Sequence, residues 1–151
     1  MAKGIYCLIF SNPSCTVRTG ALGRLSFEAG WHIYVGSALG SGGLKRVERH
    51  ASLAGNPGRS PRWHVDYILT DPHFLLSAAV FAYTINKLEC RLAAGLGGDY
   101  VAGFGCSDCN CHSHLFFRPR DPLEEIVLVF RGLGLEPVIK TIMSQQTKAN
   151  L

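Results

Sequence analysis

The sequence contains five side chains whose types and order could form a chemically active site: two tyrosines, an arginine, a histidine and a glutamate. Tyr6 ends a Gly-Ile-Tyr motif, and Tyr34 begins a Tyr-Val-Gly motif. Arg46 and His50 are four residues apart, so a helix would place both on one face, one turn apart. A histidine titrates close to neutral pH and can therefore accept or relay a proton. Glu89 stands beside the apolar stripe of a predicted helix, a position that suits a ligand facing a groove.

The most basic stretch of the chain covers residues 41–64. Against a single acid, Glu48, it carries five basic residues: Lys45, Arg46, Arg49, Arg59 and Arg62. Such a patch binds phosphates with little sequence preference, although a merely solvated surface is the alternative. The net charge of +4 permits a polyanionic partner without demanding one. His64, at the end of this stretch, is a further candidate for a phosphate contact.

A run rich in soft metal ligands follows near residue 110. It contains Cys106, Cys109, Cys111, His112 and His114. A Cys-x-x-Cys pair with nearby histidines can bind zinc, but the usual second, distant pair is absent and all the ligands would come from one loop. A thiol cluster, or a wall of a substrate site, is therefore an equal alternative. Without an export signal, the six cysteines are expected to be reduced thiols.

The composition predicts one folded domain over residues 1–151. Hydrophobic residues make up 47% of the chain and charged residues 17%, which excludes a disordered protein. We see no signal peptide, and the longest apolar run, residues 74–82, is about half the length that a membrane span needs, so a cytoplasmic protein is expected.

Hydrophobic patterns predict a mixed set of elements. Strands are expected over residues 3–10, 22–27, 31–37, 75–84, 114–118 and 136–142, and helices over residues 44–53, 86–96 and 123–133. Residues 63–69 fit either a strand or a short helix. Strands and helices do not alternate strictly, so the fold class is α/β or, more closely, α+β, with antiparallel content.

The order of these motifs resembles the GIY-YIG nuclease superfamily. That pattern has a Gly-Ile-Tyr strand, a second strand ending in Tyr-x-Gly, an arginine on the next helix and a glutamate on a helix after the third strand. The resemblance covers about residues 3–93. Arg-x-x-Arg-His, Trp-His-Val-Asp-Tyr, Glu-Cys and the cysteine-rich run are similar to a little-characterised branch, a domain of unknown function. Members of that branch stand alone or beside endonuclease III-type repair domains.

The resemblance implies a fold and a role for each motif residue. The fold would be a small mixed, partly antiparallel sheet flanked by helices, with a core over about residues 3–96, a family-specific extension over about 97–143 and a frayed tail over 144–151. Glu89 would hold one Mg²⁺ or Mn²⁺ ion, and Arg46 would brace the phosphate. Tyr6 and Tyr34 would lie near the attacking water, and His50 occupies a position where relatives carry tyrosine or histidine.

The resemblance also implies a position for the cysteine-rich loop, and the sequence differs from the superfamily pattern in two places. The loop would pack near the glutamate helix and bring His114 or Cys109 close to Cys90. Ser37 stands where many members have lysine or threonine, and no equivalent of a late asparagine is evident.

The expected function is therefore a metal-dependent endonuclease that hydrolyses nucleic-acid phosphodiester bonds in DNA repair or processing. DNA is favoured over RNA, a repair glycosylase is an implied partner, and no membrane partner is expected. Two alternatives remain open. One is a non-catalytic nucleic-acid-binding module on the same fold, and the other is a zinc or thiol module centred on residues 106–114.

Overall fold

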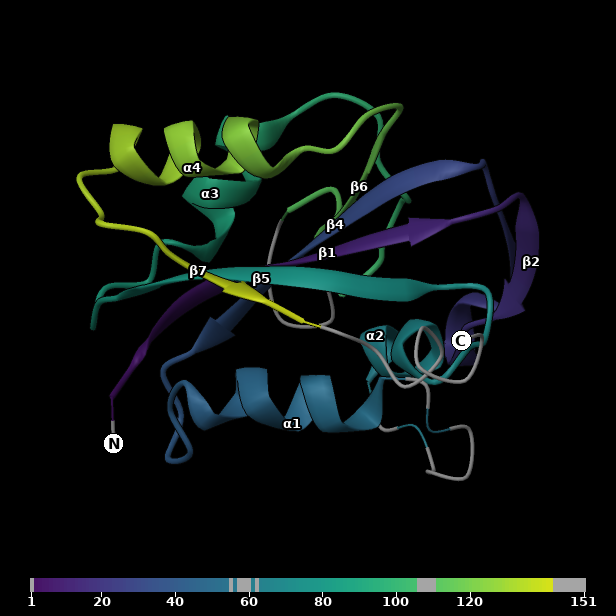
Figure 1. Ribbon diagram of the computed structural model, residues 1–151, viewed down its shortest axis with the longest axis horizontal. Coiled ribbons are helices and arrows are strands. Elements are labelled where there is room, and N and C mark those ends of the chain that lie inside the picture. Colours follow the sequence, from purple (N-terminus) through teal and green to yellow (C-terminus); the bar gives the residue numbers. More distant parts are fainter. Residues whose placement is uncertain (1, 55, 57–60, 62, 106–110, 143–151) are drawn as a thin grey trace.

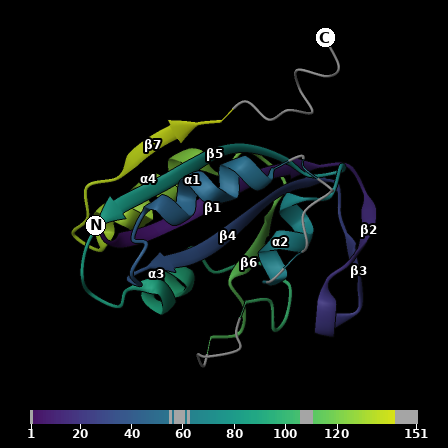
Figure 2. The ribbon, with the colours of Figure 1, turned by 90° about the horizontal axis from the view of Figure 1, so that it is seen from below.

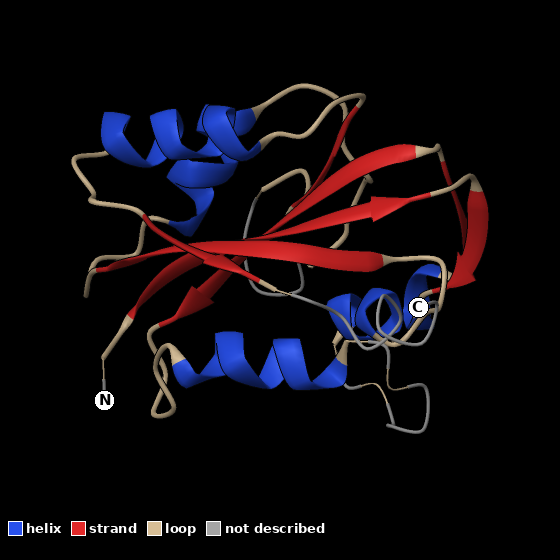
Figure 3. Ribbon diagram, in the orientation of Figure 1, coloured by secondary structure: helices blue, strands red, loops and turns tan. Residues whose placement is uncertain are grey.

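The computed structural model describes residues 2–54, 56, 61, 63–105 and 111–142, and it has the predicted α+β class. Figure 3 shows its strands gathered between two groups of helices. The elements in chain order are β1 (Gly4–Asn12), β2 (Cys15–Arg18), a 3-10 turn (Gly20–Leu22), β3 (Arg24–Phe27), β4 (Gly30–Ala38), α1 (Lys45–Leu53), α2 (His64–Leu69), β5 (Leu75–Tyr83), α3 (Glu89–Leu96), β6 (Leu115–Arg118), α4 (Leu123–Gly132) and β7 (Val138–Thr141).

The described strands form one five-stranded sheet and one hairpin. The sheet has the order β6-β4-β1-β5-β7, and β2 pairs with β3. Every pairing in both is antiparallel. Both edge strands, β6 and β7, follow α3 in the chain, so the C-terminal part completes a sheet that the N-terminal part begins. Figure 2 shows β7 along one edge and β6 near the other.

The central strand β1 separates two hydrophobic cores. Tyr6 and Phe10 enter the core shared with α1 and α2, whereas Ile5 and Ile9 enter the core shared with α3 and α4. Figure 1 shows these two helix pairs on opposite faces of the sheet. Because successive side chains of a strand point to opposite faces, a strand covered on both sides must be apolar at every position. This explains the uninterrupted hydrophobic run at the start of the chain.

Three local features differ from the sequence prediction or go beyond it. The α3 helix begins at Glu89 rather than at residue 86, because the Asn86 N–H instead donates to Oγ1 of Thr84 in a tight turn. The strand β2 was not predicted. It is only four residues long, and Val17 is its one buried residue. Residues 63–69, which fitted either element, form the helix α2.

Candidate active site

A cavity of about 560 Å³ brings together residues from distant parts of the chain. It lies between the N-terminal turns of α2 and α3, the helix α1 and the strands β1 and β4. The polar and charged side chains on its wall include Tyr6, Tyr34, Arg46, His50, His64, Lys87, Glu89 and His114. All five residues that the ordered motifs singled out, Tyr6, Tyr34, Arg46, His50 and Glu89, therefore share one wall.

Tyr6 is fixed by a close contact with Gly36. The two residues face each other across the β1–β4 pairing, and a Cβ atom at position 36 would overlap the ring and hydroxyl of Tyr6. Tyr6 is almost fully buried, and its ring centroid is 6.5 Å from that of Tyr34. Burial raises the pKa of Tyr6 well above its ordinary value of 10.0, Tyr34 raises it further, and the nearby Arg46 partly opposes both. Tyr6 is therefore a neutral phenol.

We expect Gly36→Ala to reduce the free energy of unfolding by about 2 kcal/mol, because the added methyl group displaces a buried ring in a packed core. Urea unfolding measures this change. Gly132, the last residue of α4, has open space around its Cα, so Gly132→Ala is the matched control and should change stability by less than about 1 kcal/mol. Equal effects of the two substitutions would contradict the proposed packing role of Gly36.

His50 is the hydrogen-bond partner of Tyr6. Its Nε2 lies 2.8 Å from the Tyr6 hydroxyl, and its ring is buried. Burial lowers the pKa of His50 from 6.5 to about 4; the nearby Asp66 opposes this shift, while Arg46 and Arg49 add to it. Its Nδ1 has no hydrogen-bond partner among the described residues. At neutral pH the pair is therefore an uncharged phenol and an uncharged imidazole, joined by one hydrogen bond whose proton belongs to either the Tyr6 oxygen or Nε2 of His50.

Arg46 brings a permanent positive charge to the cavity. Its Nη1 donates a hydrogen bond of 2.9 Å to the backbone carbonyl of Ser37. Its guanidinium carbon is 5.1 Å from the centroid of the Trp63 ring, and that of Arg49 is 4.8 Å away. Trp63 is 39% exposed and lines the cavity, so it supports two arginines at the rim.

Glu89 is the first residue of α3 and, among the described residues that line the cavity, the only carboxylate. Its Oε1 lies 3.8 Å from Nδ1 of the buried His114. Lys87, two residues earlier, also lines the cavity. Sequence reasoning missed this lysine; the available signal was a cation in the turn that leads into the glutamate helix.

His64 and Asp66 have separate roles. Nδ1 of His64 accepts a hydrogen bond of 3.0 Å from the backbone N–H of Gly105, so in the neutral ring the proton is on Nε2. The buried Asp66 does not line the cavity. Its Oδ2 accepts a hydrogen bond from the Trp63 N–H and caps the start of α2.

The fold places the described basic residues of this stretch at different hollows of the surface. Arg46 lines the cavity and Arg49 lies next to it, whereas Lys45 lines a separate hollow with Tyr83 and Lys140. Two further predicted contacts, Arg59 and Arg62, lie outside the described residues.

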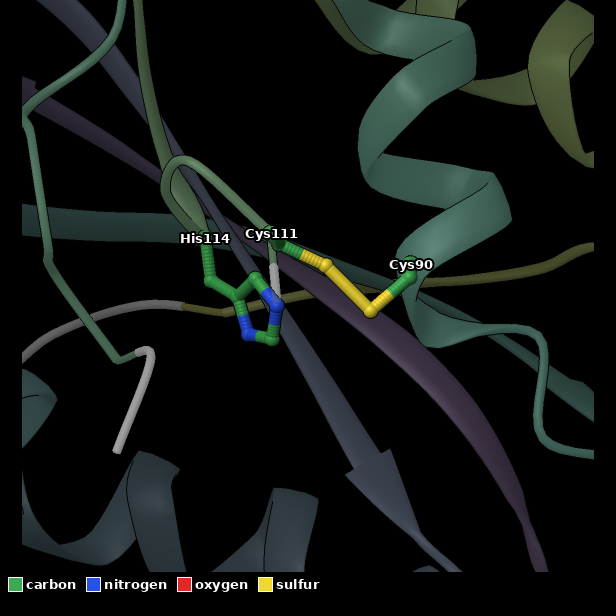
Figure 4. A group of neighbouring side chains, drawn as sticks. All are labelled: Cys90, Cys111 and His114. Carbon is green, nitrogen blue, oxygen red and sulfur yellow. A yellow bond between two sulfur atoms is a disulfide. The ribbon is translucent and has the colours of Figure 1, made fainter. Parts of the chain in front are cut away.

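The described side chains of the cysteine-rich loop also lie in different places. Cys111 forms a disulfide with Cys90 on α3. The expectation that all cysteines are reduced is therefore wrong for this pair. The two cysteines are 21 positions apart in the chain, and only the fold brings them together. Figure 4 shows His114 beside the two sulfur atoms. His112 is exposed and instead stacks on Tyr100, with ring centroids 5.8 Å apart. Cys106 and Cys109 lie outside the described residues.

The fold and the cavity define an α+β domain whose antiparallel sheet carries a polar site lined by residues of three helices. A family model described as a domain of unknown function, DUF123, matches residues 5–135, and the chain belongs to this family. Comparisons with curated proteins and with solved structures gave no match. Across the described part of the chain, no helix combines the length and apolar character that crossing a membrane requires.

Proposed function

We propose that the chain is a metal-dependent endonuclease of the GIY-YIG type that hydrolyses phosphodiester bonds in nucleic acid. The observation that carries this proposal is the shared cavity wall. A hydrogen-bonded tyrosine–histidine pair, an arginine and a carboxylate face the same space. Phosphodiester hydrolysis needs these functions: removal of a proton from the attacking water, stabilisation of charge on the phosphoryl group and a site for a metal ion.

The donor set of the cavity fits a hard divalent cation. Glu89 offers one carboxylate and the cavity leaves room for water and phosphate oxygens, which is how Mg²⁺ is commonly bound next to phosphates. When bound, Mg²⁺ or Mn²⁺ would act as a Lewis acid toward the phosphoryl oxygens. Lys87 would add a positive charge on the same side of the cavity.

The tyrosine–histidine pair supports a proton relay. In one arrangement of the shared proton, the Tyr6 hydroxyl donates to Nε2 of His50. The attacking water can then pass a proton to the Tyr6 oxygen while Tyr6 passes its own proton to His50. Tyr6 thus remains a neutral phenol, and the charge appears on His50 as an imidazolium, which burial also disfavours, so this protonated state would be short-lived. Tyr34, whose ring is next to Tyr6, would orient the water.

Arg46 would bind the phosphoryl group. A guanidinium offers several N–H donors, so the bond to the Ser37 carbonyl through Nη1 fixes its orientation and leaves other donors for phosphate. Ser37 thus contributes its backbone carbonyl at the position where the sequence departs from the superfamily pattern. We propose DNA rather than RNA as the substrate, in repair or processing, with a repair glycosylase as a functional partner.

The proposal is tested by incubating the protein with labelled single-stranded, duplex, flapped and branched DNA and RNA. We expect cleavage of at least one substrate in Mg²⁺ or Mn²⁺ and none in EDTA. Arg46→Ala should slow the single-turnover rate by about 100-fold through loss of a charge-stabilising donor. Arg24→Ala, an exposed arginine on β3, is the matched control and should cut at the wild-type rate. Tight binding that needs no metal, with no cleavage of any substrate, would overturn the proposal in favour of a binding module.

A further inference from the structure

A second cluster of chemically active side chains contributes two residues, Cys90 and His114, to the lining of the same cavity and has no part in the proposed mechanism. The ligand atoms of Cys90, Cys111 and His114 all lie within 4.8 Å of one another. Within the described residues, this is the one group of three or more histidine, cysteine or acidic side chains placed closely enough to hold a metal ion. Figure 4 shows that the cluster joins the first turn of α3 to the segment that leads into β6.

We propose that Cys90, Cys111 and His114 bind one thiophilic divalent cation, such as Zn²⁺, when the disulfide is reduced. This site is separate from the Mg²⁺ or Mn²⁺ position proposed at Glu89, and it does not depend on nuclease activity.

The chemistry of the ligand set supports this assignment. Two thiolates and an imidazole are ligands that zinc prefers, and three protein ligands leave a fourth position for water. Zinc–sulfur and zinc–nitrogen bonds of about 2.3 and 2.0 Å place tetrahedral ligand atoms roughly 3.5 Å apart. Because the three ligand atoms already lie within 4.8 Å, side-chain rotations alone are enough to surround a cation.

The backbone around the cluster is held in place independently of the sulfur atoms. The N–H of His114 donates to the Phe104 carbonyl at 2.9 Å, and its carbonyl accepts from the Val35 N–H at 2.8 Å. Cys90 is fixed by α3, which packs into the core through Leu92. The Cα atoms of Cys90 and Cys111 are 6.1 Å apart. Reduction therefore leaves two thiols facing a buried imidazole.

Disulfide and bound cation exclude each other. A thiol or phosphine reductant supplies two electrons, and with two protons the Cys90–Cys111 bond becomes two thiols. Binding of a divalent cation then releases both thiol protons, while the neutral imidazole of His114 contributes a lone pair. Cys90 is exposed, so a reductant can reach this bond.

The test is a Co²⁺ titration of the full chain, with no nucleic acid present, before and after reduction with a phosphine. Thiolate coordination gives a charge-transfer band in the near ultraviolet. We expect the band only in the reduced protein, with saturation at one equivalent and loss of the band when Zn²⁺ is added. The same Zn²⁺ should raise the melting temperature of the reduced protein and leave that of the oxidised protein unchanged.

Variants assign the ligands. Cys90→Ser and Cys111→Ser should each abolish the one-equivalent band, and His114→Gln should weaken Co²⁺ affinity. Cys15→Ser removes a free cysteine on the separate hairpin and should keep the full band. If Cys111→Ser fails to fold, the exposed position of Cys90 makes Cys90→Ser the deciding variant. A reduced protein without the band, or a band that persists in Cys90→Ser, would overturn the proposal whether or not the protein cleaves nucleic acid.

Discussion

Replacement of Glu89 by glutamine is expected to slow metal-dependent cleavage by about 10³-fold, because a metal ion supplies several kcal/mol of transition-state stabilisation. Glutamine keeps the size of the side chain but replaces an anionic oxygen ligand with a weaker neutral one. Among the described residues, no other carboxylate lines the cavity to take its place. The half-saturating Mg²⁺ concentration should therefore rise in Glu89→Gln together with the fall in rate.

A second glutamate-to-glutamine substitution separates this effect from a general change in charge. Glu124 is exposed in the first turn of α4, away from the cavity, and Glu124→Gln should retain the wild-type rate and the wild-type Mg²⁺ dependence. Thermal melting of both variants shows whether the fold is intact. A Glu89→Gln protein that cuts at the wild-type rate would remove the metal role of Glu89, although the chain could still be a nuclease.

The fold was largely predictable because its signals are local. The apolar run of β1, the helical spacing of α1 and the Pro and Gly residues around α4 each fix an element from a few neighbouring residues. The motif glycines also have a structural explanation: a Cβ at Gly4 would overlap the Ala82 carbonyl, and one at Gly36 would overlap the Tyr6 ring. Part of the motif signal therefore reports close packing of the sheet rather than chemistry.

The contacts within the site were less predictable because they join distant residues. The Tyr6–His50 bond spans 44 positions and the bond from Gly105 to His64 spans 41. The sequence indicated which residue types could act, but not that His50 would be buried and neutral. It also predicted reduced thiols, because only the fold brings Cys90 next to Cys111.

Two buried histidines are expected to make the protein sensitive to mild acid. Burial lowers the pKa of both His32 and His50 from 6.5 to about 4, so in this range the unfolded chain binds protons that the folded chain does not. Stability is therefore complete above pH 6.5 and is lost as the pH falls toward 4. Below pH 6 each histidine contributes a slope of about 1.4 kcal/mol per pH unit, so stability should fall by about 4 kcal/mol between pH 7 and pH 5.

Urea unfolding at several pH values between 7 and 5 measures this slope, and single substitutions show how much of it each histidine contributes. His50→Gln removes the partner of Tyr6 and lowers stability at pH 7, but the informative quantity is its pH slope, which should be about half that of the wild type. His32→Gln should reduce the slope by a similar amount, even though His32 bonds to Asn12 and does not line the cavity. If His50→Gln keeps the full wild-type slope, His50 is not held neutral by the fold. The pKa of His50 would then be close to its value in the unfolded chain, and the conclusion that burial holds this imidazole neutral would be withdrawn.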